Sequence, residues 1–132
     1  MCPARSADHF DLTISLHLHD RRRFVVSTPS FIAIADLYRL RDYLKDHLRA
    51  LQSSPDAQSF VFTPLELGFQ LQALGGEVRA PNDGECTVRL MVQVASGEDH
   101  PRLYVGCESG VTAAAMRAFI AQLDAIVAAA AS

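Results

Sequence analysis

Polar and apolar residues alternate in several parts of this chain, and the alternation restricts the fold more than any other feature of the sequence. From His9 to His19 every second residue is apolar, namely Phe10, Leu12, Ile14, Leu16 and Leu18. A period of two is typical of a strand with one buried face, because successive side chains point to opposite sides. Similar segments follow, so we expect about six strands, at residues 9–19, 23–27, 59–63, 65–74, 85–95 and 102–108.

Two further segments have apolar residues at helical spacing. Steps of three and four residues separate the leucines from Leu37 to Leu51, which predicts an amphipathic helix of about 18 residues that begins near Ala33. Residues 111–130 predict a second helix, since alanine fills most positions beside an apolar stripe. This stripe contains Met116, Phe119, Ile120, Leu123, Ile126 and Val127.

The order of these elements, ββαββββα, favours an α+β fold in which two helices pack on one face of an antiparallel sheet, because short loops join most of the strands. Gly75-Gly76 and Asn82-Asp83-Gly84 have the composition of turns. The chain length suits one domain, 1–132, in which we expect residues 1–8 to be a flexible tail. A nonpolar slot between the layers that held a small compound would contradict this arrangement.

If both helices cover the apolar side of the sheet, the other side displays polar residues with few charges. Such a face is suited to binding another protein, and acidic loops attract basic partners. We therefore expect a partner-binding surface formed by this face and by the loop residues Glu98 and Asp99. The face contains Thr13, Ser15, His17, His19, Gln70, Gln72, Thr87, Arg89, Met91, Gln93 and Tyr104.

The charge balance argues against nucleic acid as a partner. The chain has 12 Lys and Arg against 15 Asp and Glu, a net charge of −3, so it offers no basic surface for phosphates. The acidic excess lies between residues 75 and 110, where it either attracts a basic partner or serves solubility alone. Three cysteines and no secretory signal indicate the cytoplasm. No membrane helix is expected, because Arg117, Gln122 and Asp124 interrupt the alanine-rich end.

The sequence contains no catalytic motif, and we predict no catalytic residue, no metal and no cofactor. His17 and His19 lie on the same side of the first predicted strand, where two imidazoles can share a metal, but no third ligand is evident. His9, His47 and His100 are predicted to be surface histidines. Cys107 faces the core by alternation, which is typical of an inert thiol.

The segment Pro64-Leu65-Glu66-Leu67-Gly68-Phe69 resembles a stretch found in WapI-type bacterial immunity proteins. The order of predicted elements is similar over most of the chain, and the chain departs from the stretch at Leu67, where proline is expected. The resemblance implies a cytosolic protein that neutralises a cognate toxin by stoichiometric binding, without turnover. It gives no residue-level site, and Glu66 and Gly68 are as readily conformational requirements as contacts.

Two other functions stay open. A self-associating structural domain would pair with its own copy through the open sheet face or an edge strand, with Met91 and Tyr104 in the interface. A small metal-dependent enzyme would use His17, His19 and His100. A toxin-like gene directly upstream favours immunity, while measurement of molecular mass and a zinc titration test the two alternatives.

Overall fold

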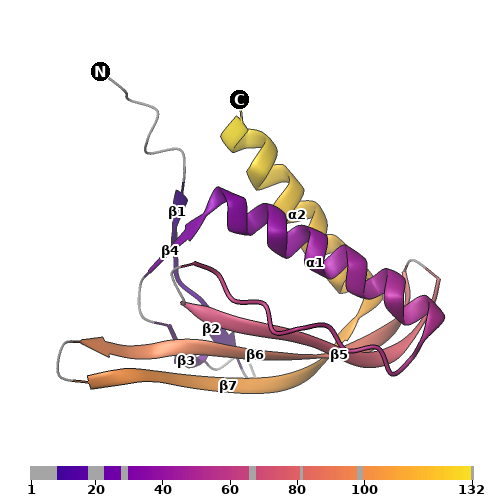
Figure 1. Cartoon of the computed structure of the whole chain (residues 1–132), viewed down its shortest axis with the longest axis horizontal. Coiled ribbons are helices and arrows are strands. Elements are labelled where there is room, and N and C mark those ends of the chain that lie inside the picture. The colour runs from indigo at the N-terminus through magenta and orange to yellow at the C-terminus, as the bar shows by residue number, and fades with distance from the viewer. Residues whose placement is uncertain are drawn as a thin grey trace.

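The computed structural model describes residues 9–17, 23–27, 30–65, 68–80, 82–97 and 100–131, and residues 1–8, expected as a tail, lie outside these ranges. Within them the chain forms seven strands and two helices (Figure 1). Their bounds are β1 His9–Leu12, β2 Ser15–His17, β3 Arg23–Val26, β4 Ser30–Ala33, α1 Ile34–Ser53, β5 Phe69–Ala80, β6 Asp83–Gly97, β7 His100–Thr112 and α2 Ala113–Ala131.

The strands form three antiparallel sheets, which pair β1 with β4, β2 with β3, and β5, β6 and β7 in that order. The α+β class, the antiparallel pairing and the two helices are therefore confirmed, whereas a single sheet of about six strands is wrong. The predicted strand 9–19 is interrupted at Thr13 and Ile14. There the N–H of Ile14 donates to Ser27 Oγ at 2.8 Å, and the N–H of Ser27 donates to the Ile14 carbonyl at 2.8 Å. These bonds link two short ribbons instead of continuing one ladder.

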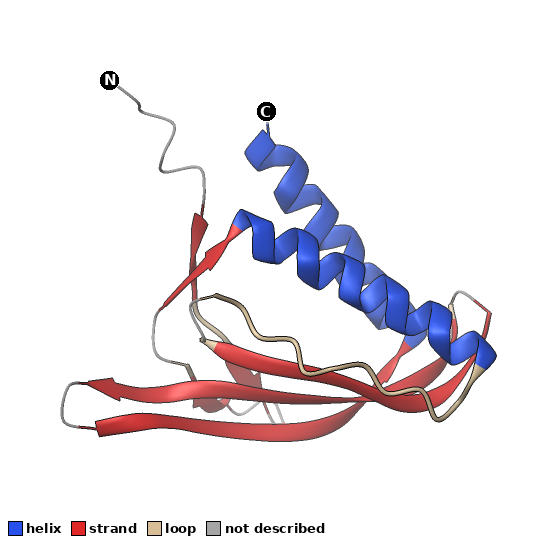
Figure 2. Cartoon of the chain, in the orientation of Figure 1, coloured by secondary structure: helices blue, strands red, loops and turns tan. Residues whose placement is uncertain are grey.

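Residues 54–65, which we term the strap, run along the edge of β5 that β6 leaves free (Figure 2). Phe62 and Leu71 exchange backbone hydrogen bonds of 2.7 and 3.0 Å, and the N–H of Ser59 donates to the Ala73 carbonyl at 3.0 Å. The predicted strand 59–63 is thus reduced to one isolated bridge, and the predicted strand 65–74 begins only at Phe69. Pro64 has no N–H to donate, so regular pairing does not continue through it.

Gly75 and Gly76 lie inside β5 and not in the turn that the sequence predicts. The pairing with β6 shifts register between Ala73 and Gly76, and a Cβ atom on Gly76 would lie 2.2 Å from the Glu85 carbonyl oxygen. A β-bulge with closely approaching backbones therefore requires glycine here. Of the predicted turn at residues 82–84, Asn82 lies in the turn, whereas Asp83 and Gly84 already belong to β6, since Asp83 pairs with Ala80 and Gly84 with Val78. Gly84 has a φ of 124°, which glycine adopts readily.

The two helices run in opposite directions over one face of the β5–β6–β7 sheet (Figure 1). The Arg41 guanidinium of α1 donates to Asp124 of α2 at 3.3 Å, which joins the helices at their outer side. The predicted leucine stripe of α1 is buried, at Leu37, Leu40, Leu44, Leu48 and Leu51. It belongs to one apolar core with the inner face of the sheet, which includes Phe69, Ala73, Cys86 and Val92.

Apolar side chains occupy most of the circumference of α2, whereas α1 has a polar side as well as an apolar one. Its predicted stripe is only partly buried, since Phe119 and Ile126 are each 43% exposed. Helical rotation places these two residues beside the buried row of Met116, Ile120, Leu123 and Val127. Among the described helices α2 is long and apolar enough to cross a membrane, with a mean hydropathy of 1.5 over Ala113–Ala130, and 28% of that window is buried in the protein. The core helix of a soluble protein meets the same criteria, so the length and composition of α2 do not show whether the protein lies in a membrane.

Candidate functional site

The side of the β5–β6–β7 sheet that faces away from the helices brings together six of the thirteen predicted binding residues, namely Gln70, Gln72, Thr87, Arg89, Met91 and Tyr104. Cross-strand register places Gln70 opposite Met91, Gln72 opposite Arg89, and Arg89 opposite Glu108 on the next strand. Residues paired in register share a face of the sheet. We term this surface the outward face, and it consists of Gln70, Gln72, Thr87, Arg89, Met91, Tyr104 and Glu108.

Arg89 connects the three strands of the outward face through its guanidinium. Its Nε donates to Glu108 Oε1 at 2.8 Å, its Nη2 donates to the same oxygen, and its Nη1 donates to Gln72 Oε1 at 3.4 Å. The Arg89 and Glu108 side chains are 48% and 51% exposed, so water screens the pair. The network therefore holds polar groups in place without contributing much to stability.

Met91 forms the apolar centre of the outward face. Its partner in register is Gly106, where a Cβ atom would lie 2.7 Å from Met91 Cγ, so the methionine lies across the bare β7 backbone. Two shallow hollows of about 140 and 300 Å³ flank it, and Arg89 and Met91 line both. A flexible thioether between two hollows can adapt to a partner side chain.

The outward face becomes acidic toward the β5–β6 hairpin. Glu77 lies opposite Glu85 in register, and both are exposed. Like charges directly opposite each other destabilise a sheet, and a basic partner would relieve this repulsion. Arg79 offsets it in part, with Nη2 at 3.3 Å from Glu77 Oε2.

The structure brings Gln70, Gln72, Arg89, Met91 and Tyr104 together, but it does not unite all predicted binding residues. Thr13, Ser15 and His17 are exposed on the separate segment formed by β1, β2 and the residues between them. His19, Glu98 and Asp99 lie outside the described residues.

Gln93 is not displayed on the outward face as expected, because it is only 8% exposed. The pairing of β6 with β7 shifts register directly after Gln93, and β6 also contacts β3. The sheet is irregular where a simple alternation would have left the side chain in water.

Glu108 is a member of the outward face that the sequence analysis did not select. The sequence could have indicated Glu108 through the register of the β6–β7 hairpin. In the register that pairs Val92 with Val105, Arg89 lies opposite Glu108. Cys107, predicted to face the core, is instead an exposed free thiol. It lies on β7, the edge strand of the sheet.

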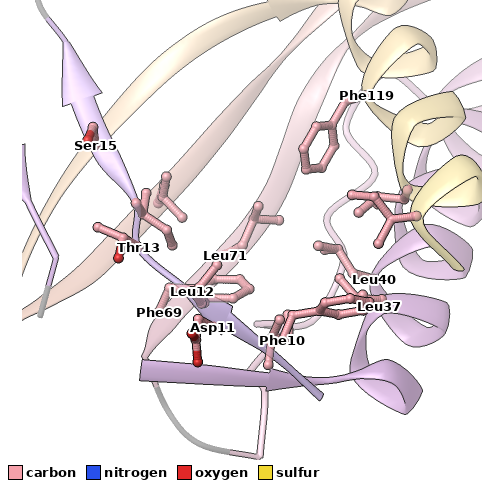
Figure 3. Close-up of a pocket in the computed structure, with 15 residues that line it drawn as sticks. Phe10, Asp11, Leu12, Thr13, Ser15, Leu37, Leu40, Phe69, Leu71 and Phe119 are labelled. Carbon is pink, nitrogen blue, oxygen red and sulfur yellow. The ribbon is translucent and has the colours of Figure 1, made fainter. Parts of the chain in front are cut away.

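A large apolar space, which we term the interlayer cavity, lies between the β1–β2 segment, the two helices and the inner face of the sheet (Figure 3). Its volume is about 710 Å³. A nonpolar space between the layers is therefore present, and it would contradict the arrangement expected from the sequence if it held a small compound. The lining residues are Phe10, Asp11, Leu12, Thr13, Ile14, Ser15, Ile32, Leu37, Leu40, Phe69, Leu71, Leu90, Phe119, Leu123 and Ile126.

His47 is 1% exposed, so its prediction as a surface histidine is wrong. Its Nε2 donates to the Leu74 carbonyl at 2.7 Å, and its Nδ1 accepts from the Ser59 hydroxyl at 2.8 Å in the neutral tautomer. Burial lowers the pKa of His47, because it removes water from the charged imidazolium, although the Leu74 carbonyl opposes this shift. His47 therefore fastens α1 to the strap and β5 and is closed to solvent.

Tyr43 makes a second link of the same kind. Its hydroxyl donates to the Phe60 carbonyl at 2.6 Å and accepts from the N–H of Ala73 at 3.0 Å. Burial raises the pKa of Tyr43. Both buried polar groups thus serve the packing of the strap and offer no reactive atom to a substrate.

The segment 64–69 positions the chain where the strap enters β5. The N–H of Leu65 donates to the buried Asp36 carboxylate at 2.8 Å, and Asp36 also accepts from Arg39. A Cβ atom on Gly68 would lie 2.4 Å from Ser30 Oγ, while the Gly68 carbonyl accepts from the N–H of Gln93 at 3.0 Å. A side chain at position 68 would therefore collide with Ser30 unless the Ser30 side chain moved. Glu66 and Leu67 lie outside the described residues.

Within the described part of the chain, no three His, Cys, Asp or Glu side chains gather as a metal site. His17 is exposed on β2, and its proposed partner His19 falls in a gap of the description. Comparison of the chain with protein-family models, with curated proteins and with solved structures found no match.

Proposed function

We propose that this chain is a non-catalytic, cytoplasmic binding protein that recognises a protein partner through the outward face. The observation that carries the proposal is the Gln72–Arg89–Glu108 network beside Met91, on a sheet face that the two helices leave uncovered. Together they offer fixed hydrogen-bonding groups around one adaptable apolar centre. Arginine and methionine are enriched in interface cores, and a rigid sheet loses little freedom on binding.

The partner that fits best is a toxin domain with a basic surface. The WapI-type resemblance of residues 64–69 supports an immunity protein, and the Glu77–Glu85 pair supports a positively charged docking surface. Complementary charge would accelerate association and make the rate fall as salt rises. Neutralisation would follow from stoichiometric binding alone.

The experiment is a binding titration with the toxin domain encoded beside this chain's gene, combined with rescue of bacterial growth. We expect a one-to-one complex and rescue by the unmodified chain. Met91→Arg, which places a charge at the centre of the outward face, should weaken binding by about 100-fold or more, because central interface residues carry most of the affinity.

Ala118→Arg is the matched control, since Ala118 is exposed on α2, away from the outward face. It should bind and rescue like the unmodified chain. Absence of a complex, or equal binding by the Met91→Arg variant, would refute recognition through this surface.

Self-association is a second candidate function, favoured by the position of β7. The strap covers the free edge of β5, whereas β7 is the last strand of its sheet in the described part of the chain. An uncovered edge can pair with the same edge of a second copy. Light scattering at micromolar concentration should then give a dimer mass, and Ser109→Pro on β7 should give the monomer. A monomer mass for the unmodified chain would eliminate this candidate.

A further inference from the structure

We propose that the interlayer cavity binds a neutral small molecule with one long hydrocarbon chain. This activity is separate from binding of the protein partner, because Leu71 and Leu90, which line the cavity, lie on the side of the sheet opposite the outward face. The volume of about 710 Å³ falls within the range typical of ligand sites, roughly 300–1,000 Å³.

The walls of the cavity come from distant parts of the chain and are apolar throughout their depth. Figure 3 shows Phe10, Leu12 and Leu71 grouped together and Phe119 of α2 apart from them at the upper right. Ile32, Leu37, Leu40, Phe69 and Leu123 are the most deeply placed, at 4–6% exposure. A thin hydrocarbon chain reaches such depth more readily than a folded protein element does.

Water is a poor occupant of this space. The lining residues with polar side chains are Asp11, Thr13 and Ser15, and all three are exposed. They alternate along the chain with Phe10, Leu12 and Ile14, which are partly buried and pack against the core. A buried water needs two to four polar partners, and packed cores leave few voids larger than one water molecule. An apolar ligand would fill the cavity with matching surface.

The charge of the lining selects the polar end of the ligand. Among the described residues that line the cavity, Asp11 is the single ionisable one, and none is Lys, Arg or His. A fatty-acid carboxylate or a phosphate would therefore find no cationic partner and would face the Asp11 carboxylate. A neutral end group, such as a hydroxyl or an ester, fits.

Two residues of α2 mark the opening. Phe119 and Ile126 line the cavity and are each 43% exposed, so they contact both the interior and solvent. The occupant enters between α2 and the β1–β2 segment, with its hydrocarbon chain inward. We term this opening, formed by Phe119 and Ile126, the mouth. Matched control substitutions can be made at Ala118 and Ala125, which are exposed neighbours of these residues and do not line the cavity.

The test is displacement of the fluorescent probe N-phenyl-1-naphthylamine by straight-chain alcohols from octanol to tetradecanol. Affinity should rise about fourfold for each added methylene group until the cavity is full. Tetradecanoate should bind more weakly than tetradecanol. Phe119→Asp and Ile126→Trp should abolish displacement, whereas Ala118→Asp and Ala125→Trp should retain it, and circular dichroism checks that each variant is folded.

Several outcomes would overturn the proposal. Probe binding that is absent, independent of alcohol length, or unchanged in both mouth variants would show that the cavity takes no such ligand. If the unmodified chain were a dimer that Phe119→Asp converts to a monomer, the mouth would be a contact with a second copy of the chain and not a ligand entrance. If the chain bound phosphatidylcholine vesicles but no monomeric alcohol, the mouth would be a contact with a lipid bilayer and not a ligand entrance.

Discussion

The two faces of the β5–β6–β7 sheet have opposite characters although the same three strands form them. On the inner face Phe69, Ala73 and Val92 are at most 4% exposed and join the core beneath the helices. On the outward face Arg89 and Glu108 are about half exposed and pair with each other. The residues that form the core are thus distinct from those proposed to bind a partner, so substitutions on the outward face are expected to change binding without unfolding the protein.

The inner side itself has two unlike ends. Beside the strap, His47 and Tyr43 have hydrogen-bond partners, and no described buried side-chain nitrogen or oxygen lacks one. Beside the β1–β2 segment lies the interlayer cavity. Stability is therefore expected to come mainly from the strap end, and ligand binding from the other end.

The largest contrast between the faces is expected for truncation of an apolar side chain. Leu48 of α1 belongs to the same core cluster as the inner face of the sheet and is 0% exposed. Leu48→Ala should therefore lower the free energy of unfolding by about 3 kcal/mol through lost burial and a new cavity. Met91→Ala on the outward face should cost about 1 kcal/mol or less, because Met91 is only partly buried. Urea denaturation compares them, and equal losses would remove the distinction between the faces.

Loss of the His47 link should rank next. His47→Ala leaves the Leu74 carbonyl and the Ser59 hydroxyl without their partner, which should cost about 2 kcal/mol. His17→Ala is the control, since His17 is exposed on β2 and should change stability by less than about 0.5 kcal/mol. Similar unfolding midpoints for the two variants would contradict the role of His47 at the strap end.

The lowered pKa of His47 predicts how stability depends on pH. Below the ordinary histidine pKa of about 6.5 the unfolded chain binds a proton that the folded His47 resists, so stability falls as pH decreases through this range. The slope from this residue approaches about 1.4 kcal/mol per pH unit at most. Denaturation between pH 8 and 5 measures it, and His47→Gln should flatten the curve. An unchanged slope in that variant would contradict the buried, neutral histidine.

The smallest effect on stability is expected at the Arg89–Glu108 pair. Because both side chains are about half exposed, Arg89→Ala should change the free energy of unfolding by about 0–1 kcal/mol. The same variant should weaken partner binding by about tenfold or more, as arginine is a common interface anchor. A large loss of stability with unchanged binding would reverse the roles assigned to the two faces.

Alternation along the chain predicted the faces of the long strands well. The pattern in residues 85–95 places Arg89 and Met91 on one side and Val88 and Val92 on the other, as the structure does. A period of two reports which side a residue occupies because the pleat alternates regardless of the neighbouring strand.

Alternation does not report which strands pair or where pairing stops. The division at Thr13 and Ile14 depends on the side chain of Ser27, and the strap depends on hydrogen bonds that irregular backbone makes to β5. His47 had a usable signal, since it lies three residues after Leu44 and four before Leu51 on the buried side of α1. The interlayer cavity had none, because a pattern assigns sides and not the volume left between them.

Recognition through the outward face can be tested by hydrogen–deuterium exchange of the chain, alone and mixed with the toxin domain proposed as its partner. If the outward face docks the partner, binding slows amide exchange in the segments of β5, β6 and β7 that contain Gln72, Arg89 and Glu108, while the exposed side of α1 exchanges as before. Protection confined to the helices or to the β1–β2 segment would contradict recognition through the outward face.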